Sequence, residues 1–154
     1  MGDNLHANDL PDEANVVRYI KPTMVLEDGR VDGSEFRLRA HRPDDTGVSV
    51  NWLECFGALS KAEQLDEVRR LSRLDMRKSG RLAELNVGTT KHYIRNEPDD
   101  LRFIHTPLLA ESDYEADPSH SEIVGLPPGN SPQAALIGDM IAECIEAIHP
   151  AVKE

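Results

Sequence analysis

The apolar residues of this chain come in short runs that turn-forming residues interrupt, and this pattern constrains the fold more than any other feature. The clearest run is Val48–Trp52, where apolar and polar residues alternate as they do in a half-buried strand. Asp28-Gly29 lies between two apolar runs and predicts a hairpin with a type I′ turn. Short strands joined by tight turns pair antiparallel, so we expect a mostly antiparallel sheet.

The same criteria predict further strands along the chain. These runs cover residues 16–20, 24–26, 36–38, 82–87, 92–95, 101–105 and 122–126. Residues 88–91 are expected to form a loop. The sequence therefore predicts six to eight short strands in a sheet that is curved or closed into a partial barrel.

Two segments show helical periodicity instead. Ser60 and Glu63 have the spacing of a capping box, and apolar residues at three-residue steps follow, which predicts a helix over about 61–75. Ser131 before Pro132 is a helix start, and a broad apolar face extends the second helix over 132–149. We expect an α+β fold with both helices on one face of the sheet, in a single domain, since 154 residues suit one domain.

The beginning of the chain differs in composition. Residues 1–15 are polar and acidic without periodicity, which predicts a disordered acidic tail before a domain over 16–154. They contain neither a basic start nor an apolar stretch, so we expect a cytoplasmic protein. The apolar runs are far shorter than the roughly 20 residues of a membrane-spanning helix, so we expect no membrane association.

The charge of the chain is strongly acidic. The sequence has 17 Lys and Arg against 28 Asp and Glu, a net charge of −11, which argues against generic nucleic-acid binding because that depends on cations that neutralise phosphates. The charge is also uneven. A basic cluster consists of Arg69, Arg70, Arg73, Arg77, Lys78 and Arg81. The acidic segment 97–122 includes Asp99, Asp100, Glu111, Asp113, Glu115 and Asp117.

Each charge cluster has two interpretations. The basic cluster either complements the negative end of the first helix and pairs with Asp66 and Glu67, or forms a site for an anion or an acidic partner. The acidic segment is either a solvated loop or a docking surface for a basic protein partner, where charge complementarity raises association rate and specificity.

Signatures of catalysis are weak. The sequence contains no phosphate-binding glycine loop, no nucleophile elbow and no histidine or cysteine spacing typical of a metal site, so we expect no cofactor and no metal. The run from Asp28 begins like a calcium loop, but Arg30 and Arg39 stand where oxygen ligands are needed.

Two histidines next to hydroxyl residues remain as candidates. His105 precedes Thr106, and His120 precedes Ser121, at the ends of expected strands. Either histidine could act as an acid or base, with Arg42 or Arg95 as an anion clamp. However, adjacent residues on a strand point to opposite faces, so a histidine cannot act together with the hydroxyl beside it. Structural roles for both histidines are therefore the simpler interpretation.

Two further features concern association. Cys55 and Cys144 are expected to be buried free thiols rather than a disulfide. Gly138 and Ala142 flank the broad apolar face of the second helix, where a second copy could approach to form a homodimer unless the sheet covers that face.

The sequence thus favours a small acidic protein-interaction factor without a catalytic signature. Such a factor would be an accessory subunit or an inhibitor of immunity or antitoxin type that binds a basic partner surface. The alternative is a small metal-independent phosphodiesterase or transferase that uses His105 or His120.

Overall fold

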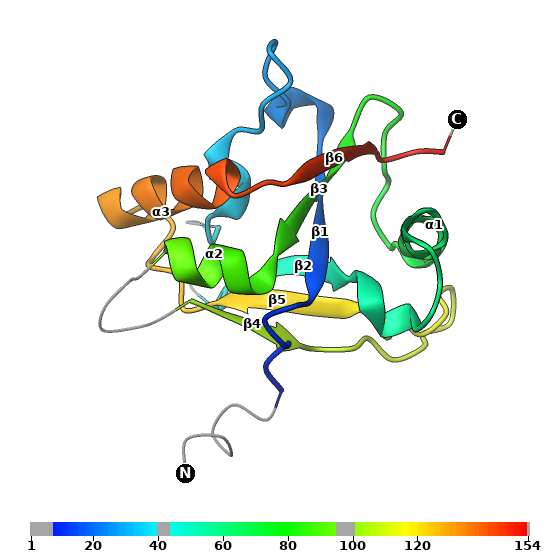
Figure 1. Ribbon diagram of the computed structural model, residues 1–154. Coiled ribbons are helices and arrows are strands. Elements are labelled where there is room, and N and C mark those ends of the chain that lie inside the picture. Colours follow the sequence, from blue (N-terminus) through cyan, green and yellow to red (C-terminus); the bar gives the residue numbers. More distant parts are fainter. Residues whose placement is uncertain (1–7, 40–43, 95–100, 154) are drawn as a thin grey trace.

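The computed structural model describes residues 8–39, 44–94 and 101–153, and it gathers most of the strand-forming runs into one sheet (Figure 1). Its strands within the described residues are β1 (Asn15–Ile20), β2 (Val48–Trp52), β3 (Arg81–Asn86), β4 (Arg102–His105), β5 (His120–Val124) and β6 (Ala147–Pro150). They lie in the order β4-β5-β2-β1-β3-β6, and all neighbours are antiparallel. The predicted α+β fold with a curved antiparallel sheet in a single domain is confirmed.

The helices cover both faces of this sheet rather than one face. Val16 and Val17 of β1 point to opposite faces, and both are fully buried, so this strand needs cover on each side. Val17 packs in a cluster with Leu65 and Val68 of α1 (Lys61–Leu71). Val16 packs in a second cluster with α3 (Pro132–Glu143) and the 3₁₀ helix η3 (Gly33–Phe36). The expectation of two helices on one face was therefore wrong.

The start of α1 follows the sequence, and its end does not. The Ser60 hydroxyl accepts from the Glu63 amide while the Glu63 carboxylate accepts from the Ser60 amide, which is the predicted capping box. The helix ends at Leu71 and not near residue 75. Ser72 adopts an extended conformation, and its hydroxyl accepts from the Leu74 amide, so the helical hydrogen bonds are replaced locally.

The second predicted helix is also shorter than expected. Ser131 caps α3 by accepting from the Ala134 amide, and Pro132 occupies the first turn, as predicted. The helix ends at Glu143 and not at residue 149. The amide of Glu146 donates to the Glu84 carbonyl, and the residues that follow pair with β3 as strand β6.

Two segments expected as strands contain helical residues instead. Residues 92–95 were expected to be a strand after a loop, but Val87–Tyr93 forms α2, and residue 95 lies outside the described residues. Its start is fixed by Asn86, whose side chain accepts from the Thr89 amide. Residues 36–38 form no strand either, because Asp32 accepts from the Ser34 amide and starts η3.

The structured part of the chain begins earlier than the predicted boundary at residue 16. The Leu10 amide donates to the Phe103 carbonyl, and the His105 amide donates to the Asn8 carbonyl, so residues 8–10 pair along the outer edge of β4. Leu10 is only 3% exposed. Residues 1–7 of the predicted tail lie outside the described residues. This pairing covers an edge that would otherwise present free backbone groups.

The predicted hairpin at Asp28-Gly29 exists, with a different turn. The Leu26 amide donates to the Arg30 carbonyl, and the Gly29 amide donates to the Leu26 carbonyl. Within this loop only Gly29 has positive φ, at 87°, whereas a type I′ turn needs positive φ at two positions. The loop is therefore a turn followed by a glycine bulge.

Two further expectations can be compared with the structure. Cys55 and Cys144 are free and half-buried, and burial raises the pKa of both thiols. Among the described residues, none of the helices has the length and apolar character needed to cross a membrane.

Candidate binding groove

The two candidate histidines do not meet in one site. His105 of β4 lies opposite Ser121 of β5, so His120, the neighbour of Ser121, points to the other face of the sheet. His105 Nε2 lies 2.6 Å from the Pro118 carbonyl oxygen, and its ring makes an edge contact with Trp52.

His120 has its own polar partners on its face. Its Nδ1 lies 2.8 Å from the carbonyl oxygen of Thr106, and its Nε2 lies 3.3 Å from the hydroxyl of Ser49. Each ring thus holds neighbouring strands or turns in place. Arg42 and Arg95, the predicted anion clamps, lie outside the described residues, as do Asp99 and Asp100.

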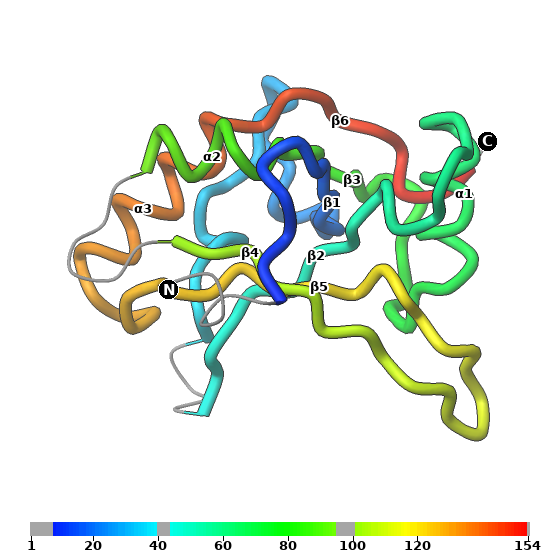
Figure 2. Tube along the Cα trace, turned by 60° about the horizontal axis from the view of Figure 1, so that its bottom comes forward, coloured from blue at the N-terminus to red at the C-terminus, as the bar shows by residue number. Residues whose placement is uncertain are grey.

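The basic cluster and the acidic segment contact each other. Residues 106–119, here called the arm, run from β4 to β5 and project beyond the sheet on the side of α1 (Figure 2). Arg70 pairs with Glu115, and Arg73 pairs with Glu111 at 3.4 Å. From the sequence we expected these two clusters to bind separate partners, but in the fold they pair with each other.

Arg73 is the centre of this contact. Its Nη2 donates to the Leu109 carbonyl at 2.7 Å and to the Glu115 carbonyl at 3.1 Å. Its guanidinium carbon lies 5.2 Å from the ring centroid of Tyr114. Arg70 also donates hydrogen bonds to Glu67 of its own helix. These bonds and the charge of Glu115 raise the pKa of Arg70. Glu111 and Glu115 of the arm therefore already have cationic partners.

The other acidic residues of the arm differ in exposure. Asp113 is exposed. Asp117 is only 3% exposed, so it is not part of a docking surface. Its carboxylate accepts from the amide and hydroxyl of Ser119 and from the side-chain amide of Asn51, and these bonds fix the base of the arm.

Arg69 and Arg70 line a smaller groove of about 570 Å³ between the end of α1 and residues 151–153, together with Lys153. Arg69 pairs with Asp66 and donates to the Pro150 carbonyl, and Lys153 pairs with the same aspartate. Arg77 pairs with Asp75 on the surface, and Arg81 donates to the Gly80 carbonyl, while Lys78 is exposed. Most of these cations thus serve the fold, which weakens the case for an anion site here.

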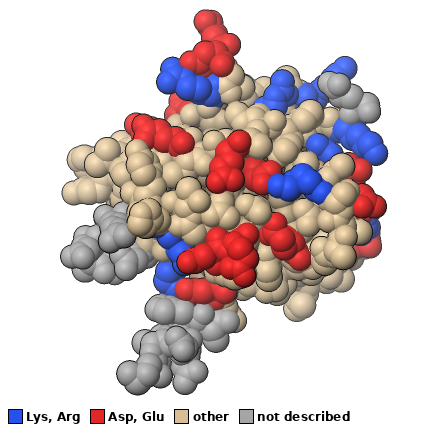
Figure 3. Space-filling view, viewed as in Figure 1, with Lys and Arg blue, Asp and Glu red and all other residues tan. Residues whose placement is uncertain are grey.

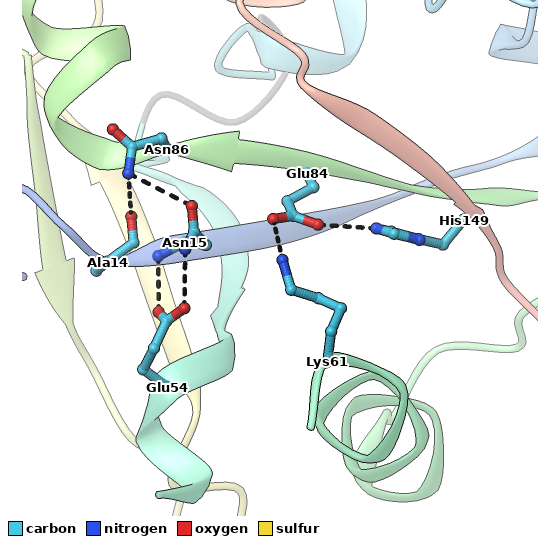
Figure 4. Close-up of polar contacts among 7 residues, drawn as sticks. All are labelled: Ala14, Asn15, Glu54, Lys61, Glu84, Asn86 and His149. Carbon is cyan, nitrogen blue, oxygen red and sulfur yellow. Dashed lines mark hydrogen bonds and ion pairs between the residues drawn. The ribbon is translucent and has the colours of Figure 1, made fainter. Parts of the chain in front are cut away.

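A buried carboxylate that the sequence did not indicate lies on the α1 face of the sheet. Glu84 of β3 is 4% exposed, and it accepts from Lys61 Nζ through one oxygen and lies 2.8 Å from His149 Nε2 through the other (Figure 4). Burial alone would raise the pKa of Glu84, but the hydrogen bonds from Lys61 and His149 outweigh it and lower this pKa. The contact ties α1 and β6 to the centre of the sheet.

A larger hollow lies elsewhere, between the loop 26–33, the C-terminal end of α3 and β6. We call it the α3 groove. Its volume is about 740 Å³, which is sufficient for several side chains of a ligand. Apolar side chains line it, namely Leu26 of the loop, Ile145 between α3 and β6, and Ile148 of β6. Leu26 is 42% exposed and Ile148 is 41% exposed, so both offer apolar surface to a ligand.

Charges in the α3 groove are predominantly negative. The lining contains Asp28, Asp32, Asp139 and Glu143 against Arg30, four acids and one base, for a formal charge of −3. Figure 3 shows acidic side chains over the junction of α3 and β6. Asp28 is neutralised by Arg30, with which it forms an ion pair. Hydrogen bonds from Ser34 and the nearby charge of Arg37 lower the pKa of Asp32. The excess negative charge therefore comes mainly from Asp139 and Glu143 of α3.

The acids of α3 stand at the unfavourable end of their helix. Glu143 is its last residue, Asp139 lies one turn earlier, and no basic residue occupies the last turn. The C-terminus of a helix carries the negative end of its dipole, so a carboxylate there is disfavoured by roughly 0.3–1 kcal/mol. In α1 the order is the favourable one, with Glu63 in the first turn and Arg69 and Arg70 in the last.

Their partners within the chain are few. Glu143 accepts from the Tyr93 hydroxyl at 2.6 Å, and Asp139 makes no ion pair within the described part of the chain. The two carboxylates and the carbonyl end of α3 therefore form a concentrated negative site beside apolar side chains. A cation supplied from outside would relieve that repulsion.

The small residues of α3 have a role inside the fold. A Cβ built on Gly138 would lie 2.5 Å from the Gly33 carbonyl oxygen, so η3 occupies the close approach that the sequence offered to a second copy. Ala142 lines the α3 groove.

Comparison with known proteins gives no match: no family model fits the chain, and no curated protein or solved structure matches it.

Proposed function

We propose that this protein is a small acidic interaction factor that acts in the cytoplasm by binding another protein. It would be an accessory subunit or an inhibitor of immunity or antitoxin type, and it would cover a basic surface of its partner. The observation that supports this proposal is the α3 groove, where Leu26 and Ile148 expose apolar surface beside unneutralised acids. A hydrophobic centre with a charged rim is the usual anatomy of a protein-binding site.

The groove supports the proposal better than the acidic arm does. Glu111 and Glu115 of the arm already pair with Arg73 and Arg70, so a partner would have to compete with those contacts. Within the described chain Asp139 makes no ion pair, and Glu143 has a hydrogen bond from the Tyr93 hydroxyl but no cationic partner.

A capture experiment with matched variants tests the proposal. The tagged protein is incubated with extract of its native cells, and stoichiometric partners are recovered at low and moderate salt. Replacing the two exposed apolar side chains, L26S with I148T, should abolish recovery of a stoichiometric partner. Leu136 of α3 is 62% exposed but does not line the groove, so L136S is the control and should leave recovery unchanged.

Two results would overturn the proposal. One is the absence of any stoichiometric partner under both salt conditions. The other is equal recovery by the wild type and the L26S/I148T protein, since the partner would then bind elsewhere.

A further inference from the structure

We infer that the ligand of the α3 groove is a segment of a partner protein in which a lysine or arginine stands next to an aliphatic residue. This inference rests on the proposed function and specifies the chemistry of the partner. Its basis is the geometry of the groove, where a negative site and an apolar surface lie side by side.

The acidic C-terminal end of α3 indicates where the cationic residue of the ligand would bind. Asp139 and Glu143 are separated by four residues, so their side chains project from the same side of the helix into the groove. Both are exposed, and the backbone carbonyls at the helix end add to their negative potential. A lysine ammonium or arginine guanidinium seated there would receive charge-assisted hydrogen bonds, which are stronger than neutral ones.

The apolar lining of the groove indicates where the aliphatic residue of the ligand would bind. Leu26 belongs to the hairpin, and Ile148 belongs to β6, whose outer side faces no other strand in the described sheet. These two side chains, with Ile145, form the apolar surface of the groove. An aliphatic side chain placed on it would bury area from both partners, at about 25 cal/mol per Å².

The position of the acids argues for an external cation and against a purely structural role. A carboxylate at a helix C-terminus opposes the dipole, whereas the same chain places its charges favourably in α1. Asp139 gains no compensating ion pair within the described residues. Retaining a locally unfavourable arrangement is typical of binding sites, where the ligand supplies the missing interaction.

Defined peptides test this inference without knowledge of the natural partner. The probe is a short fluorescent peptide of alternating lysine and leucine. One comparison peptide replaces lysine with glutamate, and another replaces leucine with serine. We expect fluorescence anisotropy to report binding of the lysine–leucine peptide, with weaker binding by about tenfold or more for either comparison peptide.

Matched variants localise the site. D139N with E143Q removes two charges from the groove and should weaken binding of the lysine–leucine peptide by about tenfold. E111Q with D113N removes the same number of charges from the arm and should change binding by less than about twofold. I148T should weaken binding to a similar extent at low and moderate salt, because it removes apolar contact.

The outcomes separate this inference from the proposed function. Equal loss of binding in the groove and arm variants would show unspecific charge attraction and would overturn the inference. Equal binding of the glutamate–leucine peptide would overturn it as well. If the native partner is captured in a groove-dependent manner but D139N/E143Q retains it fully, the proposed function stands and the cationic partner is wrong. Peptide-induced self-association of the protein in sedimentation, without groove dependence, would also count against it.

Discussion

Gly138 of α3 lies directly against the carbonyl oxygen of Gly33, and a Cβ on Gly138 would stand 2.5 Å from that oxygen. No atom pair of this kind approaches so closely, so a side chain at either glycine forces the helix away from η3. The contact holds the loop 26–33 against α3 and thereby shapes the groove between them.

G138A is therefore expected to destabilise the protein by about 1–3 kcal/mol, although alanine is the better helix former by roughly 0.5–1 kcal/mol. Urea denaturation of the two proteins measures the difference. L136A, at an exposed position of the same helix, should stay within about 0.5 kcal/mol of the wild type. A G138A protein of equal or higher stability would show that the two segments can separate without cost.

Glu84 is expected to make the stability of the protein depend on acid pH. Its pKa is lowered in the folded state, so its contribution is present above the unfolded value of about 4.3 and disappears as the pH falls through the folded value. E84Q should destabilise the protein by about 1–3 kcal/mol near neutral pH, because Lys61 loses its ionic partner and His149 loses the carboxylate that its ring contacts.

Denaturation curves of wild type and E84Q between pH 3 and 7 check this expectation. The decisive region lies at about pH 4, where a glutamate titrates. The difference in unfolding free energy should shrink as the pH falls below that region. D113N, at an exposed position of the arm, should show no such trend. A difference that is independent of pH would argue against an ionised Glu84 in the folded protein.

Arg73 is expected to hold the arm without contributing much to global stability. R73A removes the contacts to Glu111, Tyr114 and two arm carbonyls, so the amides of residues 108–117 should exchange hydrogen faster by about tenfold or more. R77A removes only an exposed pair with Asp75 and should leave exchange in the arm unchanged. Unaltered exchange in R73A would mean that the bonds around Asp117 alone position the arm.

Asn86 is expected to combine two separable roles. Its side-chain oxygen caps α2, and its side-chain nitrogen donates to the Ala14 carbonyl at 3.3 Å and to the Asn15 side chain at 3.4 Å (Figure 4). N86A should cost about 0.5–2 kcal/mol through loss of the cap. N86D keeps the cap and loses the donors, so its unfolding free energy in thermal or urea denaturation should lie between those of wild type and N86A. Equal losses of unfolding free energy in N86A and N86D would show that the hydrogen bonds donated by Asn86, and not the cap, stabilise the protein.

Local signals in the sequence were sufficient where one hydrogen bond decides the structure. Ser60 and Ser131 mark both predicted helix starts correctly, because a hydroxyl at this position reaches an amide three residues ahead whatever the rest of the chain does. Asn86 carries a signal of the same kind for α2. It was outweighed by the β-forming residues Val87, at the first position of the helix, and Ile94, directly after its end.

Non-local pairing explains the errors at helix ends and in the site. Ile145 and Ile148 fit a helical face as well as a strand, and only pairing with β3 decides between them. The arm shows the same limit, since nothing local indicates that Glu115 lies beside Arg70, 45 residues away. The α3 groove joins segments from three parts of the chain, so no contiguous motif exists by which it could be recognised.

The contact between the arm and α1 also determines how the molecule acts on solutes that are still far away. Arg70 and Arg73 stand next to opposite charges, so their fields largely cancel beyond a Debye length, about 8 Å at physiological ionic strength. A distant solute therefore senses chiefly the overall excess of 28 acids over 17 bases. The α1 side therefore adds little repulsion for an approaching cationic molecule, since its arginines already face carboxylates. The rate of encounter should follow net charge and ionic strength, and the choice among partners should follow the lifetime of the complex.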